Sequence, residues 1–190
     1  GDQILEANPE VFTILEKGHK KFVKLRDIAN VKRGVTTGVN DFFYLTKEKS
    51  IEWKIEHEFL KLIIKSPKEC DGVLVDKNKL KYQIFICNKG KEELKGTNAL
   101  KYIEWGEKQK TEDGIYWNNV PSVKGRKYWY AINIHDIPDI ILYKHIGDKE
   151  YPIKSDNLVA NNVLYEVTLK NNFGKDNLLL FFTSSWIYLF

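Results

Sequence analysis

The sequence of 190 residues predicts an α+β fold, with a mixed, mostly antiparallel sheet and peripheral helices. Segments with helical spacing and strand-like apolar runs are interleaved without a regular strand–helix–strand rhythm, which is unlike a parallel doubly wound sheet. Hydrophobic residues make up 43% of the chain, which is enough for a packed core. We expect one domain over residues 1–190, with a lead-in helix in 1–21 and the core in 22–190.

The first elements are expected to be short. They are a helix at 8–17, a strand at 22–25, a helical turn at 26–29, and strands at 31–34 and 42–45. The first helix is predicted because Asn8 is a good N-cap and Pro9 suits the first helical position. The last two strands flank a polar loop in which Gly34 and Gly38 allow backbone angles closed to other residues.

Apolar spacing and turn residues predict the remaining elements. Further helices are expected at 56–64, 92–105 (broken near Gly96) and 178–188. Further strands are expected at 73–75, 82–87, 127–134, 139–145 and 158–169. The run at 82–87 is continuously apolar, which is typical of a central strand. Residues 108–125 are polar and predict a long loop or hairpin.

The charge balance permits a nucleic-acid partner without requiring one. The formal net charge is +4, from 30 basic and 26 acidic residues. Three of the basic residues are arginines, namely Arg26, Arg33 and Arg126. An arginine guanidinium makes bidentate contacts with phosphate or guanine that a lysine ammonium does not make, so these positions are of special interest.

The cysteines and the chain ends suggest a cytoplasmic piece of a larger protein. Cys70 and Cys87 form no CxxC pattern, and no secretory signal is visible, so we expect a reduced, cytoplasmic setting. A disulfide between the two stays an alternative. No stretch is long and apolar enough to predict a membrane span. The chain contains no methionine and ends in an apolar run, so we expect it to be a fragment of a longer polypeptide.

Catalytic motifs are not evident in the sequence. The four histidines have no metal-ligand spacing, and no Lys-Ser/Thr pair follows the glycine loop as a phosphate-binding loop would require. A nuclease is a weak alternative, because Pro138-Asp139 and Glu52-Trp53-Lys54 resemble its two metal-binding elements in reversed order. We expect no catalytic residue, metal or cofactor site in this chain, and its status as an enzyme is left open.

The order of several segments resembles a known family. The segments are Leu25–Phe43, Phe59–Lys61, Ile64–Pro67, Leu94–Ile103, Lys124–Tyr130 and Leu178–Ser185. Together they resemble the C-terminal target-recognition domain (the TaqI-like specificity domain) of adenine-specific DNA methyltransferases and of type IIG restriction-modification enzymes. Thr183 stands where this family usually has an asparagine.

The resemblance implies a division of labour within a larger protein. This chain would bind double-stranded DNA sequence-specifically. An N-terminal methyltransferase domain of the same polypeptide would bind S-adenosylmethionine and methylate adenine, and magnesium would be needed only if a nuclease is fused to it. The alternative is a non-catalytic protein–protein interaction module that packs on a partner subunit.

Polar and basic residues in three regions are the candidate DNA contacts. Those in the glycine loop suit phosphates, although a loop that only caps its own backbone explains them equally well. The long loop and the basic cluster after it could reach a groove, because Asn pairs bidentately with adenine. The third region has residue types that read bases, but a turn is the favoured interpretation. The candidates are Arg33, Thr36, Thr37, Asn40, Asn118, Asn119, Lys124, Arg126, Lys127, Lys154 and Asn161. Trp129 and Tyr130 are expected in the core.

Overall fold

The computed structural model describes residues 9–18, 20, 23–132, 134, 136–144, 151–170 and 174–183. The strands are β1 (Ala29–Arg33), β2 (Tyr44–Thr46), β3 (Leu60–Ile64), β4 (Tyr82–Phe85), β5 (Ile140–Tyr143), β6 (Ile153–Lys154), β7 (Val159–Ala160) and β8 (Leu164–Leu169). The helices are α1 (Pro9–Gly18), α2 (Leu25–Ile28), α3 (Asn40–Phe43), α4 (Lys47–Glu52), α5 (Asn98–Gly106), α6 (Pro121–Lys124) and α7 (Lys175–Thr183). Single 3₁₀ turns lie at His57–Phe59, Pro67–Glu69 and Trp117–Asn119.

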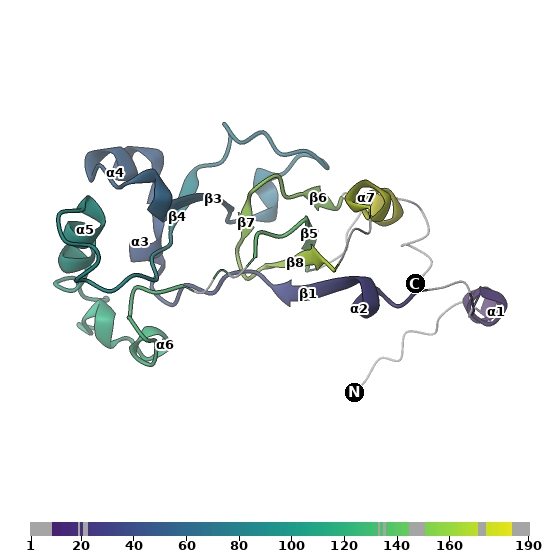
Figure 1. Ribbon diagram of the computed structural model, residues 1–190, viewed down its shortest axis with the longest axis horizontal. Coiled ribbons are helices and arrows are strands. Elements are labelled where there is room, and N and C mark those ends of the chain that lie inside the picture. The colour runs from purple at the N-terminus through teal and green to yellow at the C-terminus, as the bar shows by residue number, and fades with distance from the viewer. Residues whose placement is uncertain are drawn as a thin grey trace.

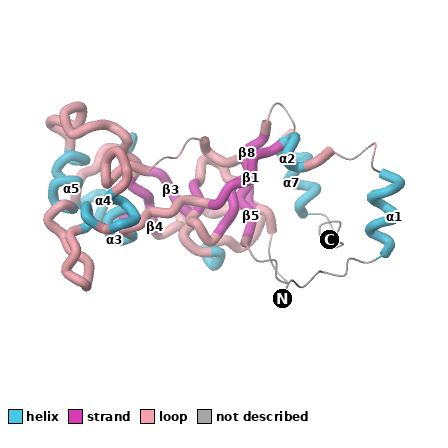
Figure 2. The backbone as a smooth tube through the Cα atoms, turned by 90° about the horizontal axis from the view of Figure 1, so that it is seen from below, coloured by secondary structure: helices cyan, strands magenta, loops and turns pink. Residues whose placement is uncertain are grey.

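Two four-stranded sheets follow one another along the long axis of the molecule (Figures 1 and 2). One has the strand order β2-β4-β3-β7, and the other has the order β1-β8-β5-β6. The strand pairs are antiparallel except for β3 and β7, which run parallel. The predicted α+β class with mostly antiparallel strands is confirmed, although the strands form two sheets.

The aromatic lobe consists of the β2-β4-β3-β7 sheet with α3 to α6. Its core is dominated by aromatic rings. Two of them, Phe42 and Phe43, are consecutive residues of the short helix α3, and both are buried in this core. The Phe42 ring stacks on Tyr102 at 4.9 Å and lies 4.5 Å from the Trp129 ring. Tyr102 donates a hydrogen bond of 2.7 Å from its hydroxyl to the Phe42 carbonyl, which satisfies its polar atom inside the core.

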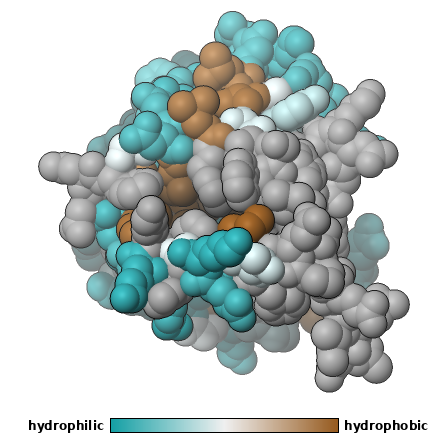
Figure 3. Space-filling view, turned by 90° about the vertical axis from the view of Figure 1, so that its right-hand side faces the viewer, coloured by the Kyte–Doolittle hydropathy of each residue, from teal (hydrophilic) through white to brown (hydrophobic). Residues whose placement is uncertain are grey.

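The aliphatic lobe consists of the β1-β8-β5-β6 sheet with α7. One face of this sheet packs Ala29, Ile140 and Val167 against Leu178 and Phe182 of α7. The opposite face packs against a second cluster, whose buried members are Ile64, Leu80, Ile141, Ile153, Leu158, Ala160 and Leu164. Figure 3 shows this end of the molecule, where hydrophobic surface appears between hydrophilic residues.

The parallel pair β3–β7 joins the two lobes. Ile63 and Val159 pair across it and belong to the aromatic core, whereas the next pair, Ile64 and Ala160, belongs to the aliphatic cluster. Beyond β1, Val35 forms a parallel bridge to Asn161. Three segments that are distant in sequence, 34–36, 160–162 and 64–65, therefore lie next to one another between the lobes.

Several predicted elements are confirmed. They are the helix at 8–17 (α1, with Asn8 outside the described residues), the turn at 26–29 (α2), the strand at 31–34 (β1), the central strand at 82–87 (β4), the helix at 92–105 after its break at Gly96 (α5), the strand at 139–145 (β5, with His145 outside the described residues) and the helix at 178–188 (α7). The single strand predicted at 158–169 is divided into β7 and β8, which belong to different sheets. The helices α5 (Asn98–Gly106) and α7 (Lys175–Thr183) begin and end at other residues than predicted, and residues 184–188 of the predicted last helix lie outside the described range.

Other predicted elements are wrong. The segment 56–64 contains a 3₁₀ turn and strand β3 instead of a helix, and 42–45 begins as helix α3 before β2 starts. Neither 127–134 nor 73–75 forms a strand in its described residues. In the segment 22–25, Phe22 lies outside the described residues, Val23 and Lys24 form no strand, and Leu25 begins α2.

Candidate nucleic-acid interface

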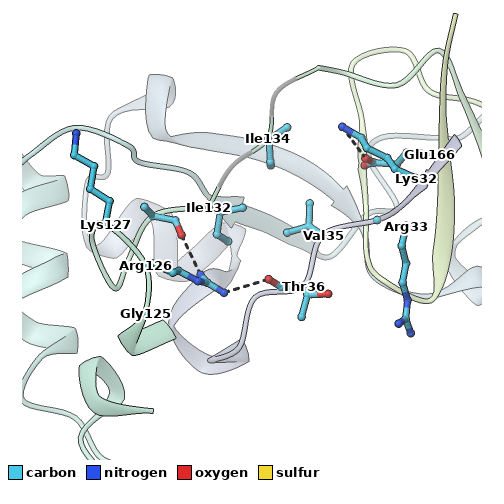
Figure 4. Close-up of a pocket in the computed structure, with 12 residues that line it drawn as sticks. Lys32, Arg33, Val35, Thr36, Gly125, Arg126, Lys127, Ile132, Ile134 and Glu166 are labelled. Atoms are coloured by element: carbon cyan, nitrogen blue, oxygen red, sulfur yellow. Dashed lines mark hydrogen bonds and ion pairs between the residues drawn. The ribbon is translucent and has the colours of Figure 1, made fainter. Parts of the chain in front are cut away.

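A cleft of about 550 Å³ lies where the two lobes meet (Figure 4). The end of β1 and the loop after it form one wall, and the chain after α6 forms the other. Four cations, Lys32, Arg33, Arg126 and Lys127, and one carboxylate, Glu166, line it together with aliphatic side chains. The cleft thus brings together four of the residues predicted from the sequence, namely Arg33, Thr36, Arg126 and Lys127.

The glycine loop enters the cleft because its first glycine lets two backbones touch. The Gly34 and Val35 N–H groups donate to the carbonyls of Leu164 (3.0 Å) and Ala160 (2.7 Å). A Cβ on Gly34 would lie 2.5 Å from the Ala160 oxygen and closer still to the Asn161 oxygen. Gly38 has φ +83°, a left-handed conformation that favours glycine, so both glycines fix the course of the loop.

Arg126 fastens the opposite wall of the cleft to this loop. Its guanidinium donates to the carbonyls of Thr37 (2.8 Å), Ala131 (3.0 Å) and Thr36 (3.4 Å). The guanidinium carbon also lies 5.5 Å from the centre of the Phe43 ring. These contacts use much of the donor capacity of the fork, so the geometry gives Arg126 a role in holding the loop in place.

Arg33 and Thr36 are exposed polar residues that line the cleft. The Arg33 Nε donates a 2.7 Å hydrogen bond to the Asn162 carbonyl, which orients the side chain while the rest of the guanidinium faces solvent. In Figure 4 this side chain points away from the Lys32–Glu166 pair. The Asn162 amide donates to Thr36 Oγ1 at 3.4 Å, which links the loop to the segment after β7.

The other two predicted loop residues belong to a hydrogen-bonded network around Tyr44. Thr37 is only 3% exposed and donates from Oγ1 to the Asn40 Oδ1 at 2.5 Å. The predicted Asn161 donates from its amide to the Tyr44 hydroxyl at 2.8 Å. Burial raises the pKa of Tyr44, and a hydrogen bond with Thr37 opposes that rise. Asn40 itself is exposed, and its side chain is oriented by the hydrogen bond from Thr37.

A buried carboxylate, Glu166, is part of the cleft lining. Glu166 on β8 is 2% exposed, accepts a 3.0 Å hydrogen bond from the Ala160 N–H and lies 3.9 Å from the Lys32 ammonium. Burial raises the pKa of Glu166, while the Ala160 hydrogen bond and the Lys32 charge act in the opposite direction. Glu166 therefore links β7 and β1 to the central strand β8.

Comparison with known proteins identifies the family of this chain. The sequence model of the C-terminal domain of type II methyltransferase M.Eco57I matches residues 6–190. The chain belongs to this family. No curated protein matches it in sequence. The resemblance to a methyltransferase C-terminal domain inferred from the sequence is confirmed.

The remaining predicted residues of this methyltransferase C-terminal domain lie outside the cleft lining. Asn118 and Asn119 form a 3₁₀ turn directly before α6, and Lys124 is exposed at the end of α6. The Asn118 Oδ1 is buried without a hydrogen-bond partner among the described residues. Lys154 lies on β6 in the aliphatic lobe and forms an ion pair of 3.1 Å with Asp176. Its segment turns at Asp156 and Asn157, which have positive φ, as the turn interpretation predicts.

The structure also bears on the two cysteines and on the weak nuclease alternative. Cys70 and Cys87 are both free thiols, so the disulfide alternative is wrong. Burial raises the pKa of Cys70 to about 12, with Glu69 and Asp71 adding to the effect.

The Asp139 carboxylate, the acid of the weak nuclease alternative, accepts a 2.9 Å hydrogen bond from the Leu169 N–H. In the part of the chain that is described, no three His, Cys, Asp or Glu side chains gather as metal ligands would, and no helix has the length and apolarity to cross a membrane.

Two residues that line this domain's cleft, Lys32 and Glu166, are not among the contacts predicted from the sequence. Lys32 precedes the glycine loop on β1. Glu166 lies beside that loop because β8 pairs with β1, a contact between residues more than 120 positions apart. Asn162, which is outside the lining, donates its amide hydrogen bond to Thr36 from the segment after β7. Trp129 and Tyr130 were assigned correctly, since both pack with the aromatic core.

Proposed function

We propose that residues 1–190 act as one domain that recognises a specific sequence in double-stranded DNA. In this proposal an N-terminal domain of the same polypeptide methylates adenine with S-adenosylmethionine, and this chain supplies no catalytic group. Membership of a methyltransferase family supports the proposal. The observation that carries it is the cleft between the lobes, where four cations line the walls together with the start of the glycine loop.

The exposure of each residue supports a division of roles. Arg33, Thr36 and Lys127 line the cleft, Lys124 is exposed at the end of α6, and all four suit phosphate contacts that set the register of the duplex. Asn40 and Asn119 are exposed amides that suit base edges. Asn118 and Asn161 are partly buried and are not assigned a base contact here. Thr37 and Arg126 hold the loop in its binding shape, and Lys154 is too engaged with Asp176 to be assigned a contact here.

Binding to a randomised duplex pool at two salt concentrations tests the proposal. Sequencing the retained DNA is expected to reveal one enriched motif, with retention falling as salt rises because phosphate contacts release counterions. Arg33→Ala is expected to weaken binding and to lower the slope of log affinity against log salt by about 1.

Arg26→Ala is the matched control, because Arg26 is an exposed arginine on α2 that does not line the cleft. If Arg33→Ala and Arg26→Ala bind DNA equally well, Arg33 is not part of the DNA interface. Absence of any DNA retention by the wild-type chain at low salt would contradict the proposed function and favour an interaction module for a partner protein.

A further inference from the structure

A second cationic hollow lies on the aromatic lobe, at the end of β3. It has a volume of about 480 Å³ and is lined by four lysines, Lys65, Lys68, Lys79 and Lys81, and by Tyr82. The chain leaves β3 at Ile64, turns through Pro67–Glu69 and returns to the same edge before β4. These lysines are not among the candidate DNA contacts predicted from the sequence.

The acidic side chains in the hollow are already engaged. The Glu69 carboxylate accepts hydrogen bonds from the backbone N–H groups of Lys65 (2.7 Å) and Ser66 (3.0 Å), which closes the turn. Asp71 pairs with Lys79 at 3.3 Å. Among the described residues, no carboxylate forms an ion pair with Lys65, Lys68 or Lys81. Counting the four lysines against the carboxylates of Glu69 and Asp71, 4 − 2, the hollow keeps a formal net charge of +2.

Lys65 is held in position by two aromatic rings. Its ammonium lies 4.2 Å from the centre of the Tyr82 ring and 5.0 Å from the centre of the Tyr44 ring. Both distances are within the range of a cation–π interaction. Because the side chain is already ordered, an anion that binds it loses less conformational entropy than it would on a free surface lysine.

The hollow and the cleft lie on neighbouring segments. The Asn161 N–H donates to the Ile64 carbonyl at 3.0 Å, and its side chain donates to Tyr44, the ring under Lys65. On its other side, Asn161 bridges to Val35 in the glycine loop. With about 4.8 Å between paired strands, the loop and the Lys65 segment are about 10 Å apart. That distance corresponds to about three base-pair steps of 3.4 Å along a duplex.

We propose that this hollow is a second DNA-phosphate site, in which Lys65, Lys68 and Lys81 hold the backbone of the same duplex that the cleft engages. The proposal rests on the proposed function. Lysine ammonium groups act as point charges and lack the planar fork that reads a base edge. The hollow therefore contributes affinity that does not depend on sequence, and the specificity comes from the cleft.

The test compares two double variants of the 190-residue chain. K68Q/K81Q removes two exposed lysines of the hollow, and the control K95Q/K101Q removes two exposed lysines next to and on α5. Dissociation constants are measured across a salt series for the duplex enriched from the pool and for an unrelated duplex of equal length. Far-UV circular dichroism checks that both variants keep the wild-type fold.

K68Q/K81Q is expected to weaken binding to both duplexes by the same factor and to lower the salt slope by about 0.9 for each phosphate that the variant no longer neutralises. The ratio of the two affinities is expected to stay at the wild-type value. If K68Q/K81Q matches the control while Arg33→Ala still weakens binding, the hollow is not on the DNA path and only this inference fails. If the wild-type chain binds neither duplex, the proposed function fails, and this inference fails with it.

Discussion

Single residues decide how closely the backbones approach at the cleft. Gly34 lies against the carbonyls of Ala160 and Asn161, and the overlap of a Cβ there would be with backbone atoms, which cannot rotate away. We expect Gly34→Ala to lower the free energy of unfolding by about 1–3 kcal/mol, as over-packing in a close-packed site does. Chemical denaturation followed by circular dichroism measures the change.

Gly125→Ala is the matched control for this prediction. Gly125 lines the same cleft, but a Cβ there would meet nothing within 4 Å, and its φ of −83° suits alanine. Its unfolding free energy is expected to stay the same or to rise by up to about 1 kcal/mol, because alanine restricts the unfolded chain. A Gly34→Ala variant as stable as Gly125→Ala would show that the two strands can separate without cost.

Two of the segments that were predicted wrongly, 56–64 and 42–45, contain consecutive buried apolar residues. In β3, Ile63 enters the aromatic core and Ile64 the aliphatic cluster, so apolar residues follow one another without the alternation of a half-buried strand. Such a run cannot be separated from a buried helix by periodicity. Phe42 and Phe43 give the opposite error, since a strand was predicted where the structure has a helical turn. Both side chains are buried in the same core, which the helical turn of α3 allows and the alternating faces of a strand do not. By contrast, β4 was predicted correctly, since it is central in its sheet.

Glu166 gives the strand network of the aliphatic lobe a dependence on pH. Because burial raises the pKa of this carboxyl in the folded protein, its favourable contribution is full below the unfolded pKa of about 4.3 and is lost as pH rises through the folded pKa. Glu166→Gln keeps an acceptor for the Ala160 N–H but does not ionise. We therefore expect the stability of this variant, relative to wild type, to increase from about pH 4 to pH 8.

Urea denaturation at several pH values measures this difference. Glu104→Gln is the control, because Glu104 is exposed on α5 and its replacement removes the same formal charge. The difference between Glu104→Gln and wild type is expected to stay within about 0.5 kcal/mol. A Glu166→Gln difference that does not change with pH would contradict the role assigned to the buried carboxylate.

At the scale of the whole molecule, the cleft exists because two lobes meet, and this determines which site residues the sequence could predict. Arg33 and Thr36 stand out because they lie in a glycine-rich loop, and Arg126 because arginine is scarce in this chain. Glu166 carries no such local signal, since it is one acid among 26 and becomes part of the cleft only through the pairing of β8 with β1. The role of Arg126 as a fastener of the loop follows from its partners and not from its neighbours in sequence.

Because β3 and β7 contribute side chains to both cores, we expect the two lobes to unfold together. Trp53, Trp105, Trp117 and Trp129 pack in or against the aromatic core, so in a Trp186→Phe background fluorescence reports on that lobe. Ile141→Ala creates a cavity in the aliphatic cluster of the other lobe and is expected to cost about 2–5 kcal/mol.

If the lobes are coupled, this variant shifts the fluorescence transition to lower denaturant by the same free energy as the circular dichroism transition. Ile51→Ala, at a position 72% exposed on α4 in the aromatic lobe itself, is the control and is expected to change stability by less than about 0.5 kcal/mol. If Ile141→Ala leaves the midpoint of the fluorescence transition unchanged, the lobes unfold independently. The cleft would then lie between two units that can separate, and the shape of the proposed DNA interface would not be fixed before binding.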